Sequence, residues 1–569
     1  MKTQRALSRP NESKKYGTKL MRTFKQPLLK LSLIGFFFAT LILSGCSEEP
    51  ATDASENAVM EPVLTTIATG ANIAGTNGLA FSADNKLYVA SVIGSTISII
   101  DPDSGEMLQT LTVEDGVVGP DDIAFGADGS YFWTSILTGE VAGFTPDGYK
   151  VVAAQLTPGV NPITFSDDGR LFVSQCFFGT GLFEVDPKGI AEPRVIAEDL
   201  GPGCGLNGMD WGSDNRLYGP RWFRGEVVSF NVEDNTMRLE ASGFTTPAAV
   251  KFDKQGILHV LDTGTGEVVK VEGDTKTVVA SLSEGLDNFA FDKDNRLFVS
   301  SFTDGFVKRV EADGSLTTLQ PGGLAHPGGI TLLNGELVIA DLHAIRFYDP
   351  ASGEETQVQR NVLGMGKMGG ALNLSTDGDN LILVSWVDGD IRVWDPVGME
   401  VVERHTGLAG PVAAVRYAGK IIATEHGSNT IIGLDNNGRT QFMSIDTPTG
   451  LAISDGNLYV TSRSEGKIYK IGNDNQMLDD PIVVAEGLTD PEGLTIVGDE
   501  FVIVQGSDGK IVATEMNGEG TTLATISAGS DAASSDQPPS MVFNGITSMP
   551  DGTLYATGET SRMLYRLTR

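Results

Sequence analysis

The chain has 569 residues, which is too many for one ordinary globular core, so either several domains or an array of repeats is expected. It carries 74 Asp and Glu residues against 41 Lys and Arg residues, giving a formal net charge of −33 at pH 7. Such an acidic chain repels nucleic-acid phosphates and anionic lipid headgroups, so we expect no nucleic-acid partner. The charge fits an adaptation for solubility, and alternatively a field that gathers cations.

The N-terminal segment has the organisation of a secretion signal. Two lysines, Lys25 and Lys30, precede the apolar run LSLIGFFFATLIL at 31–43, which is too short to span a bilayer comfortably. The run ends in LSGC at 43–46, which resembles the lipobox of bacterial lipoproteins. That resemblance implies a signal peptide over residues 1–45 and lipid modification of Cys46. The simpler alternative is a membrane anchor that happens to contain a cysteine.

Residues 46–62 are acidic, small and interrupted by proline, which is typical of a flexible tether. Ser47 follows Cys46, and the absence of an Asp there favours the outer membrane under enterobacterial sorting rules. We therefore expect a cell-envelope lipoprotein held to the membrane by its lipids alone, with the rest of the chain in an oxidising compartment.

A β-hairpin pattern organises the rest of the chain. It is first complete at 77–91, NGLAFSADNKLYVAS, where a strand at 79–81 and a strand at 87–90 flank a polar turn. The pattern returns about every 40 residues, and most copies continue with two further strands. Four antiparallel strands at this period predict a β-propeller blade. The twelve copies begin near Asn77, Asp121, Asn161, Asn207, Ala248, Asp287, Gly328, Gly370, Ala413, Thr449, Glu492 and Asn544.

Twelve blades exceed the usual four to eight of one ring, so the sequence predicts an all-β chain of two tandem six-bladed propellers. VLTTI at 63–67 precedes the first hairpin, and the similar LTTL at 316–319 precedes the seventh. The predicted domains are therefore 63–314 and 315–569, each closed by its own N-terminal strand. A single twelve-bladed ring, or closure of the second ring by the first strand, are the alternatives.

The repeats resemble six-bladed families that include NHL repeats, virginiamycin B lyase-type proteins and the senescence marker protein/gluconolactonase family. The residues that carry this resemblance are the NG…DN/DG…LYVA-type units at 77–90, 207–218 and 544–556. The resemblance implies the fold, whereas propellers of this kind host hydrolases, lyases and binding platforms alike.

The first residue of each copy should line one mouth of the central tunnel. The first half of the chain places Asp or Asn at five of its six positions, whereas the second half has mostly small residues there. Converging oxygen ligands suit a divalent cation such as Ca²⁺. The simpler alternative is that these side chains cap the turns at the strand starts. The five candidate metal ligands are Asn77, Asp121, Asn161, Asn207 and Asp287.

The gluconolactonase-like resemblance bears on individual residues. Asn207 lies in the stretch NGMDW, which is similar to a metal-binding stretch of that family. The family's other acidic ligands fall at Asn77 and Ala248, so Asp121 and Asp287 would have to supply the charge and the catalytic acid–base function. The implied ligand is a sugar-acid lactone, and the implied cofactor is a divalent cation.

Two further features belong to the same mouth. Arg221, Trp222 and Arg224 stand where other blades have small residues, and they are candidates for binding a planar or anionic ligand. Cys176 and Cys204 lie in neighbouring blades, and we expect a disulfide that braces the loop before Asn207.

Three functions remain open on sequence alone. The first is a metal-dependent hydrolase of a lactone or related ester, sited in propeller 1. The second is a lyase of the virginiamycin B type in propeller 2, for which His326, His343, Glu425 and His426 are the available residues. The third is a non-catalytic propeller that binds a small ligand or another envelope protein.

Overall fold

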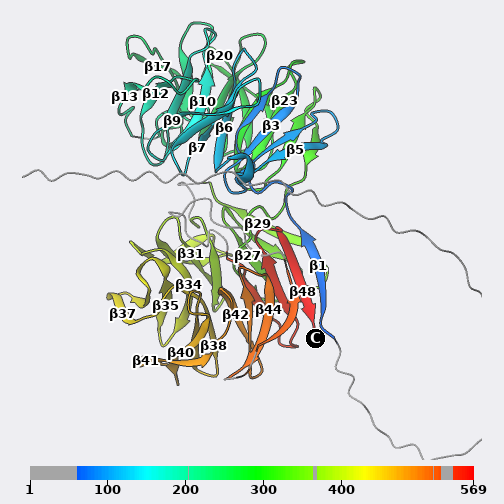
Figure 1. Cartoon of the computed structure of the whole chain (residues 1–569), viewed down its shortest axis with the longest axis vertical. Helices are drawn as coiled ribbons and strands as arrows, with labels where there is room; N and C mark the ends of the chain where they lie inside the picture. The colour runs from blue at the N-terminus through cyan, green and yellow to red at the C-terminus, as the bar shows by residue number, and fades with distance from the viewer. Residues whose placement is uncertain (1–60, 203, 363–367, 517, 519, 527–542) are drawn as a thin grey trace, which may run out of the picture. The chain divides into compact units, whose positions relative to one another are not determined.

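The computed structural model describes residues 61–569 except 203, 363–367, 517, 519 and 527–542 (Figure 1). The described residues belong to one compact unit. The predicted signal peptide, Cys46 and most of the tether lie outside them. Among the described residues, no helix is long and apolar enough to cross a membrane.

The described chain folds into twelve four-stranded antiparallel sheets. Its helical elements are three short 3₁₀ turns, η1 (Val113–Asp115), η2 (Trp222–Arg224) and η3 (His426–Ser428). The first hairpin forms as the sequence predicts, with Leu79 paired to Val89 and Phe81 to Leu87. Asn85 closes its turn in the left-handed region at φ 63°, a conformation that Asn tolerates better than most residues.

Propeller 1 contains six of the sheets. The first three are β2 (Leu79–Phe81), β3 (Leu87–Ser91), β4 (Thr96–Ile100) and β5 (Met107–Leu111); β6 (Pro120–Phe125), β7 (Tyr131–Ser135), β8 (Glu140–Phe144) and β9 (Lys150–Gln155); β10 (Val160–Phe165), β11 (Leu171–Gln175), β12 (Leu182–Val185) and β13 (Arg194–Ala197). The other three are β14 (Asp210–Trp211), β15 (Leu217–Arg221), β16 (Glu226–Phe230) and β17 (Met237–Ser242); β18 (Pro247–Phe252), β19 (Leu258–Asp262), β20 (Glu267–Glu272) and β21 (Thr275–Ser281); β22 (Leu286–Phe291), β23 (Leu297–Ser301), β24 (Val307–Val310) and β25 (Leu316–Gln320).

Propeller 2 contains the other six. Its first three are β26 (Ile330–Leu333), β27 (Glu336–Asp341), β28 (Ala344–Tyr348) and β29 (Glu355–Arg360); β30 (Asn373–Asp377), β31 (Asn380–Ser385), β32 (Asp390–Asp395) and β33 (Glu400–Thr406); β34 (Pro411–Tyr417), β35 (Lys420–Glu425), β36 (Thr430–Asp435) and β37 (Gly438–Ser444). The last three are β38 (Pro448–Ser454), β39 (Asn457–Ser462), β40 (Lys467–Asn473) and β41 (Gln476–Ala485); β42 (Pro491–Val497), β43 (Glu500–Gln505), β44 (Lys510–Glu515) and β45 (Thr521–Thr525); β46 (Ile546–Ser548), β47 (Leu554–Gly558) and β48 (Met563–Thr568), with β1 (Val63–Thr69) as the fourth strand.

Two rings form, not one ring of twelve blades. In propeller 1, β2 of the first sheet contacts β22 and β23 of the sixth. In propeller 2, β26 contacts β46 and β47 in the same way. Apolar side chains fill the space between neighbouring sheets, as where Leu79 and Val89 of the first sheet pack with Phe298 and Val307 of the sixth.

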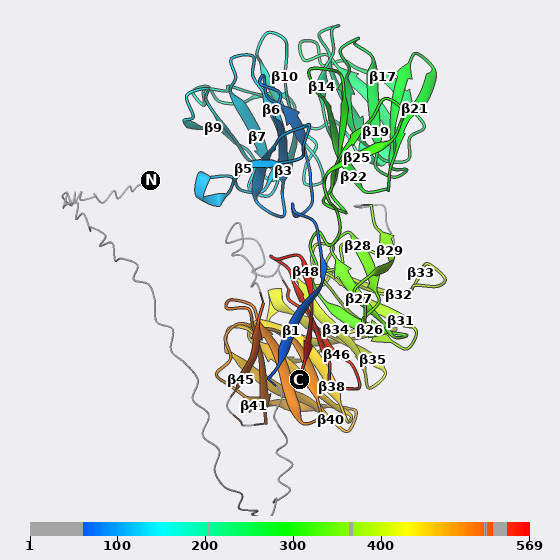
Figure 2. The ribbon, with the colours of Figure 1, turned by 90° about the vertical axis from the view of Figure 1, so that its right-hand side faces the viewer.

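The predicted closure by each ring's own N-terminal strand is wrong. Strand β1 pairs with β48 and completes the last sheet of propeller 2, next to the C-terminus of the chain (Figures 1 and 2). Strand β25 pairs with β24 and completes the sixth sheet of propeller 1, so the predicted boundary near 314 cuts through that sheet. The two strands have similar sequences, and nothing local distinguishes which open edge each will cover.

Buried hydroxyl groups join neighbouring blades at the tunnel mouth. A Ser or Thr near the end of the second strand of a blade donates a hydrogen bond to a backbone carbonyl at the start of the next blade. Ser300 reaches the carbonyl of Asn77 at 2.6 Å and thereby joins the sixth blade to the first. These hydroxyls are fully buried, so each bond also satisfies a carbonyl that water cannot reach. The other bonds of this kind run from Thr134 to Asn161, Thr424 to Thr449, Thr461 to Glu492 and Thr557 to Gly328.

The closure of propeller 2 by β1 predicts where a mutation in this strand acts. Ile67 packs on a cluster that contains Ile330 and Tyr348 of propeller 2. Ile67→Asp removes this packing and places a charge there, so we expect a loss of about 2–3 kcal/mol in stability. Hydrogen exchange should report lost protection in β48 and β47. Val63→Asp is the matched control, because Val63 lies in the same strand and is exposed; loss of protection in β24 after Ile67→Asp would contradict the pairing.

Candidate functional site

The five polar residues predicted at the propeller 1 mouth line one cavity of about 370 Å³. Asp121, Asn161 and Asp287 lie near the starts of β6, β10 and β22, the innermost strands of their blades. Asn77 and Asn207 lie just before β2 and β14. The repeat brings these residues together because the innermost strands of a propeller start around one axis. Ala248, the sixth equivalent residue, is buried and does not contribute to the cavity lining.

The amide side chains also perform the local role expected of turn residues. The Oδ1 atom of Asn77 accepts a hydrogen bond from the backbone N–H of Val92 at 3.0 Å. The Oδ1 atom of Asn207 accepts one from the N–H of Gly208 at 3.0 Å. A carbonyl oxygen has a second lone pair, so these bonds leave each amide able to contact a ligand.

The two carboxylates in this set are electrostatically strained. Burial raises the pKa of Asp121 well above its ordinary value, and the charges of Asp287 and Asp122 raise it further. Burial and the charge of Asp122 raise the pKa of Asp287 to about 7, although a hydrogen bond from Asn77 partly offsets this. None of the described residues that line the cavity is a Lys or Arg. The site therefore concentrates negative charge without a basic side chain in its lining to neutralise it.

Asp122 and Asn288, which the sequence analysis missed, form the next layer below these carboxylates. The amide Nδ2 of Asn288 donates to Oδ1 of Asp122 at 3.1 Å, which links the sixth blade to the second. Asp122 also accepts backbone N–H groups from Ile123 and Ile163. The signal was present in the sequence, because Asp122 and Asn288 directly follow the predicted Asp121 and Asp287.

The donor set fits a hard divalent cation only when the amides are included. The described residues contain no group of three or more His, Cys, Asp or Glu side chains placed to hold a metal ion. Two carboxylates and three amides do converge, and oxygen donors of these kinds are the ligands that Ca²⁺ uses. Asp121 is buried beside the charges of Asp287 and Asp122, and a bound cation would offset this repulsion.

Of the three predicted ligand-binding residues, only Trp222 lines the cavity. It packs edge-on against Phe177 at 5.5 Å between ring centroids. Arg221 is buried outside the lining, where its guanidinium donates to the carbonyls of Leu200 and Pro202 at 2.9 Å each. Arg224 pairs with Glu226 at 2.8 Å, also outside the lining. Both guanidinium groups are thus engaged elsewhere in the blade.

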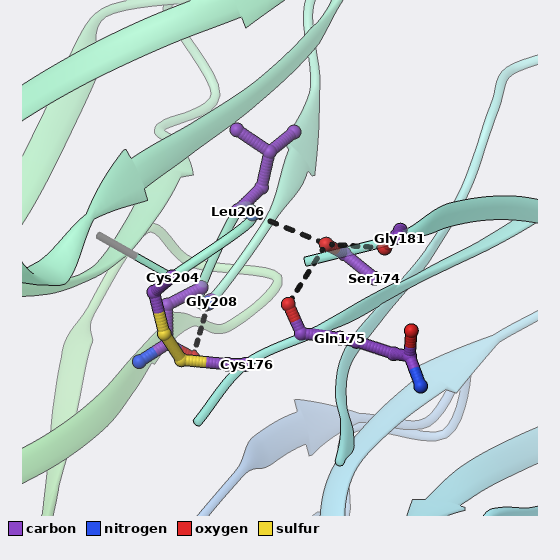
Figure 3. Close-up of a disulfide and its surroundings, with 8 residues drawn as sticks. Ser174, Gln175, Cys176, Gly181, Cys204, Leu206 and Gly208 are labelled. Atoms are coloured by element: carbon purple, nitrogen blue, oxygen red, sulfur yellow. Dashed lines mark hydrogen bonds between the residues drawn. A yellow bond between two sulfur atoms is a disulfide. The ribbon is translucent and has the colours of Figure 1, made fainter. Parts of the chain in front are cut away.

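Cys176 and Cys204 form a disulfide, as the sequence predicts, with their Cα atoms 4.6 Å apart (Figure 3). Beside it, the hydroxyl of Ser174 accepts a hydrogen bond from the backbone N–H of Leu206 at 3.1 Å. Together with the bonds from Arg221, these contacts tie down the loop that leads to Asn207. The loop therefore presents Asn207 to the cavity from a braced backbone.

Propeller 2 contributes part of the cavity wall, which the sequence analysis did not anticipate. Its contribution includes His343, Asn361 and Val387. His343 packs against Phe302 of propeller 1 at 4.7 Å between ring centroids. Burial lowers the pKa of His343 to about 4, so its imidazole is neutral at pH 7. No pattern within either half of the sequence specifies how the two rings contact one another.

A buried ion network joins the propellers beside this cavity. Asp304 of propeller 1 pairs with Arg346 at 2.8 Å and with Arg360 at 3.0 Å, both from propeller 2. Arg346, whose side chain is only 2% exposed, also pairs with Asp341 and Glu355. A guanidinium this deeply buried requires several acceptors, and propeller 1 supplies two of them, the carboxylate of Asp304 and the backbone carbonyl of Thr303.

The residues considered for a lyase site in propeller 2 do not form one site. His326 lies 2.8 Å from Glu559, and it shares a small cavity of about 10 Å³ with His343. Glu425 pairs with Arg439 and accepts the backbone N–H of Ala409. His426 packs against Trp386 at 5.5 Å. Neither Glu425 nor His426 lines the cavities that contain His343.

No family model matches the chain, and no curated protein matches it. Solved structures with some likeness include virginiamycin B lyase from Staphylococcus aureus, at 13% identity and a TM-score of 0.35 over 49% of this chain and 96% of that one. A streptogramin B lyase has 14% identity and a TM-score of 0.37 over 49% and 94%. A luciferin-regenerating enzyme has 16% identity and a TM-score of 0.34 over 42% and 88%. At such scores these likenesses carry no argument, and the propeller fold rests on the strand pairings.

The ion network predicts an acid-sensitive link between the propellers. Burial acts to raise the pKa of Asp304, but Arg346 and Arg360 outweigh it and hold the pKa below its usual value. The ionised Asp304 therefore adds stability above the unfolded pKa of about 3.9, and this contribution disappears as pH falls through the lower folded pKa. We expect Asp304→Asn to cost about 3 kcal/mol at pH 7, at the low end for a broken buried pair, because Arg346 keeps two other carboxylates.

Thermal and denaturant unfolding at pH 3–7 measure this effect. The difference between wild type and Asp304→Asn should shrink as the pH falls below about 4. Asp294→Asn, in an exposed turn of the same blade, is the control and should leave stability nearly unchanged. A difference that stays constant over the whole pH range would refute the role assigned to Asp304.

Proposed function

We propose that the propeller 1 cavity binds a divalent cation and hydrolyses a lactone or related ester. The observation that carries this proposal is that Asp121 and Asp287, from the second and sixth blades, line one cavity whose described lining contains no Lys or Arg. Such a pair is costly unless a cation or a proton accompanies it. The amides of Asn77, Asn161 and Asn207 complete an oxygen-rich set around the two carboxylates.

Hydrolysis of a lactone adds one water molecule. The water oxygen bonds to the carbonyl carbon, the ring C–O bond breaks, and one water proton passes to the released alkoxide oxygen. A divalent cation, when bound, supplies charge stabilisation at the carbonyl oxygen and lowers the pKa of water. Asp121 and the amides hold the polar end of the site, and Asp287 serves as a further ligand or as the base that takes the proton from water.

The location of the protein remains a proposal from the sequence. The LSGC motif at 43–46 supports lipid attachment at Cys46 in the cell envelope, and Ser47 supports the outer membrane. The acidic segment that follows would tether the propellers to the membrane surface, within reach of a partner protein of the envelope.

A non-catalytic binding protein is the second candidate. It is favoured by the hydrogen bonds in which the oxygens of Asn77 and Asn207 already accept backbone N–H groups. The two candidates differ in turnover and share the prediction of a ligand in the cavity.

Removal of the Asp121 charge tests cation binding. Asp121→Asn keeps the size of the side chain and removes its negative charge, so we expect Ca²⁺ affinity to fall by at least about tenfold. Calorimetric titration with Ca²⁺ and metal analysis of the purified protein measure this change. Asp210→Asn is the matched control, because Asp210 is an innermost-strand carboxylate of propeller 1 that lies outside the cavity lining and accepts backbone N–H groups. Equal Ca²⁺ affinity in the two variants, or none in wild type, would overturn the proposal.

A further inference from the structure

The walls of the propeller 1 cavity differ in chemistry from its polar end. Away from the carboxylates and amides, propeller 1 supplies Ile93, Ile136, Leu137 and Phe177. Propeller 2 supplies Val362 and Val387, together with the polar side chains of His343, Asn361 and Asp388. The cavity is therefore amphipathic, with carboxylates and amides at the tunnel mouth and a mostly apolar wall beyond it.

This arrangement does not suit a polyhydroxylated sugar lactone. Each buried hydroxyl of a sugar needs a hydrogen-bond partner, and the apolar side chains that make up most of the wall provide none. The two arginines expected to bind a sugar acid, Arg221 and Arg224, are engaged outside the cavity. The cavity volume of about 370 Å³ lies at the small end of the usual 300–1,000 Å³ range for small-molecule sites.

We infer that the ligand is a compact apolar lactone or ester, whose carbonyl end meets Asp121 and Asp287 and whose hydrocarbon tail packs between the two propellers. This inference rests on the proposed function and specifies its substrate class. It also gives propeller 2 a direct role, because Val362 and Val387 complete the wall against which the tail packs. The site is thus assembled from both rings, and propeller 1 alone would leave the tail exposed to water on one side.

A series of γ-lactones with alkyl tails from methyl to heptyl tests the inference, with glucono-δ-lactone as the polar comparison. Hydrolysis is followed in the presence of Ca²⁺, and binding is measured separately by calorimetry. We expect affinity and kcat/KM to rise by up to about fourfold for each added methylene group until the cavity is full. Glucono-δ-lactone should be the poorest ligand of the set.

Substitutions on each side of the cavity locate the tail. Leu137→Ser in propeller 1 and Val387→Ser in propeller 2 should each lower the affinity for the heptyl lactone about threefold to tenfold, and should leave that for the methyl lactone nearly unchanged. Leu137 is half-buried and Val387 is exposed, so neither change opens a hole in the core. The controls are Leu239→Ser and Val397→Ser, exposed residues of the same types in the same two propellers and outside the cavity lining.

The outcomes separate the substrate class from the proposed chemistry. Tail-dependent binding without turnover would support the apolar ligand and overturn the hydrolase. Turnover that favours glucono-δ-lactone, or that ignores tail length, would overturn the apolar ligand and leave the hydrolase standing. Loss of tail dependence in Leu137→Ser but not in Val387→Ser would overturn the role given to propeller 2.

Discussion

The hydrogen bond from a buried hydroxyl to the first carbonyl of the next blade is the interaction on which the tunnel mouth depends. Ser300 and Thr134 make it in propeller 1, and the carbonyls that they reach belong to Asn77 and Asn161. The same residues therefore carry a structural carbonyl and a side chain that faces the cavity. These hydrogen bonds fix the backbone from outside the cavity. The side chains therefore already converge before a ligand binds, and binding costs little further conformational entropy.

A second constraint joins the two rings. The chain begins its described course in the last sheet of propeller 2, builds propeller 1, and then returns, so the rings are linked by two passages of the chain. The buried pairs of Asp304 with Arg346 and Arg360 add a polar link between the rings. Breaking such a pair is costly because it leaves a buried charge without its partner. Both features link the two rings beside the mouth of propeller 1, where His343 and Val387 of propeller 2 form part of the cavity wall.

Much of the candidate site was predictable from the repeats. Aligning twelve hairpins placed Asp121, Asn161 and Asp287 at equivalent positions, and blade geometry brings equivalent positions to one mouth. Side-chain direction was not predictable for Arg221 and Arg224, because a loop residue can face the cavity or its own blade with little change in backbone. Arg221 turns away from the cavity because it binds the carbonyls of Leu200 and Pro202. Arg224 does so because it pairs with Glu226.

The sequence by itself determined the blade, the number of blades and the polar ring at the first mouth, because all three follow from short-range alternation and a fixed period. Only the tertiary structure decided that β1 completes propeller 2, since its pairing with β48 spans almost the whole described chain and two nearly identical strands compete for the open edges. Only the tertiary structure supplied the second wall of the cavity. Contacts between His343 and Phe302, or between Arg346 and Asp304, depend on how two finished rings meet, and no local pattern in either ring encodes that.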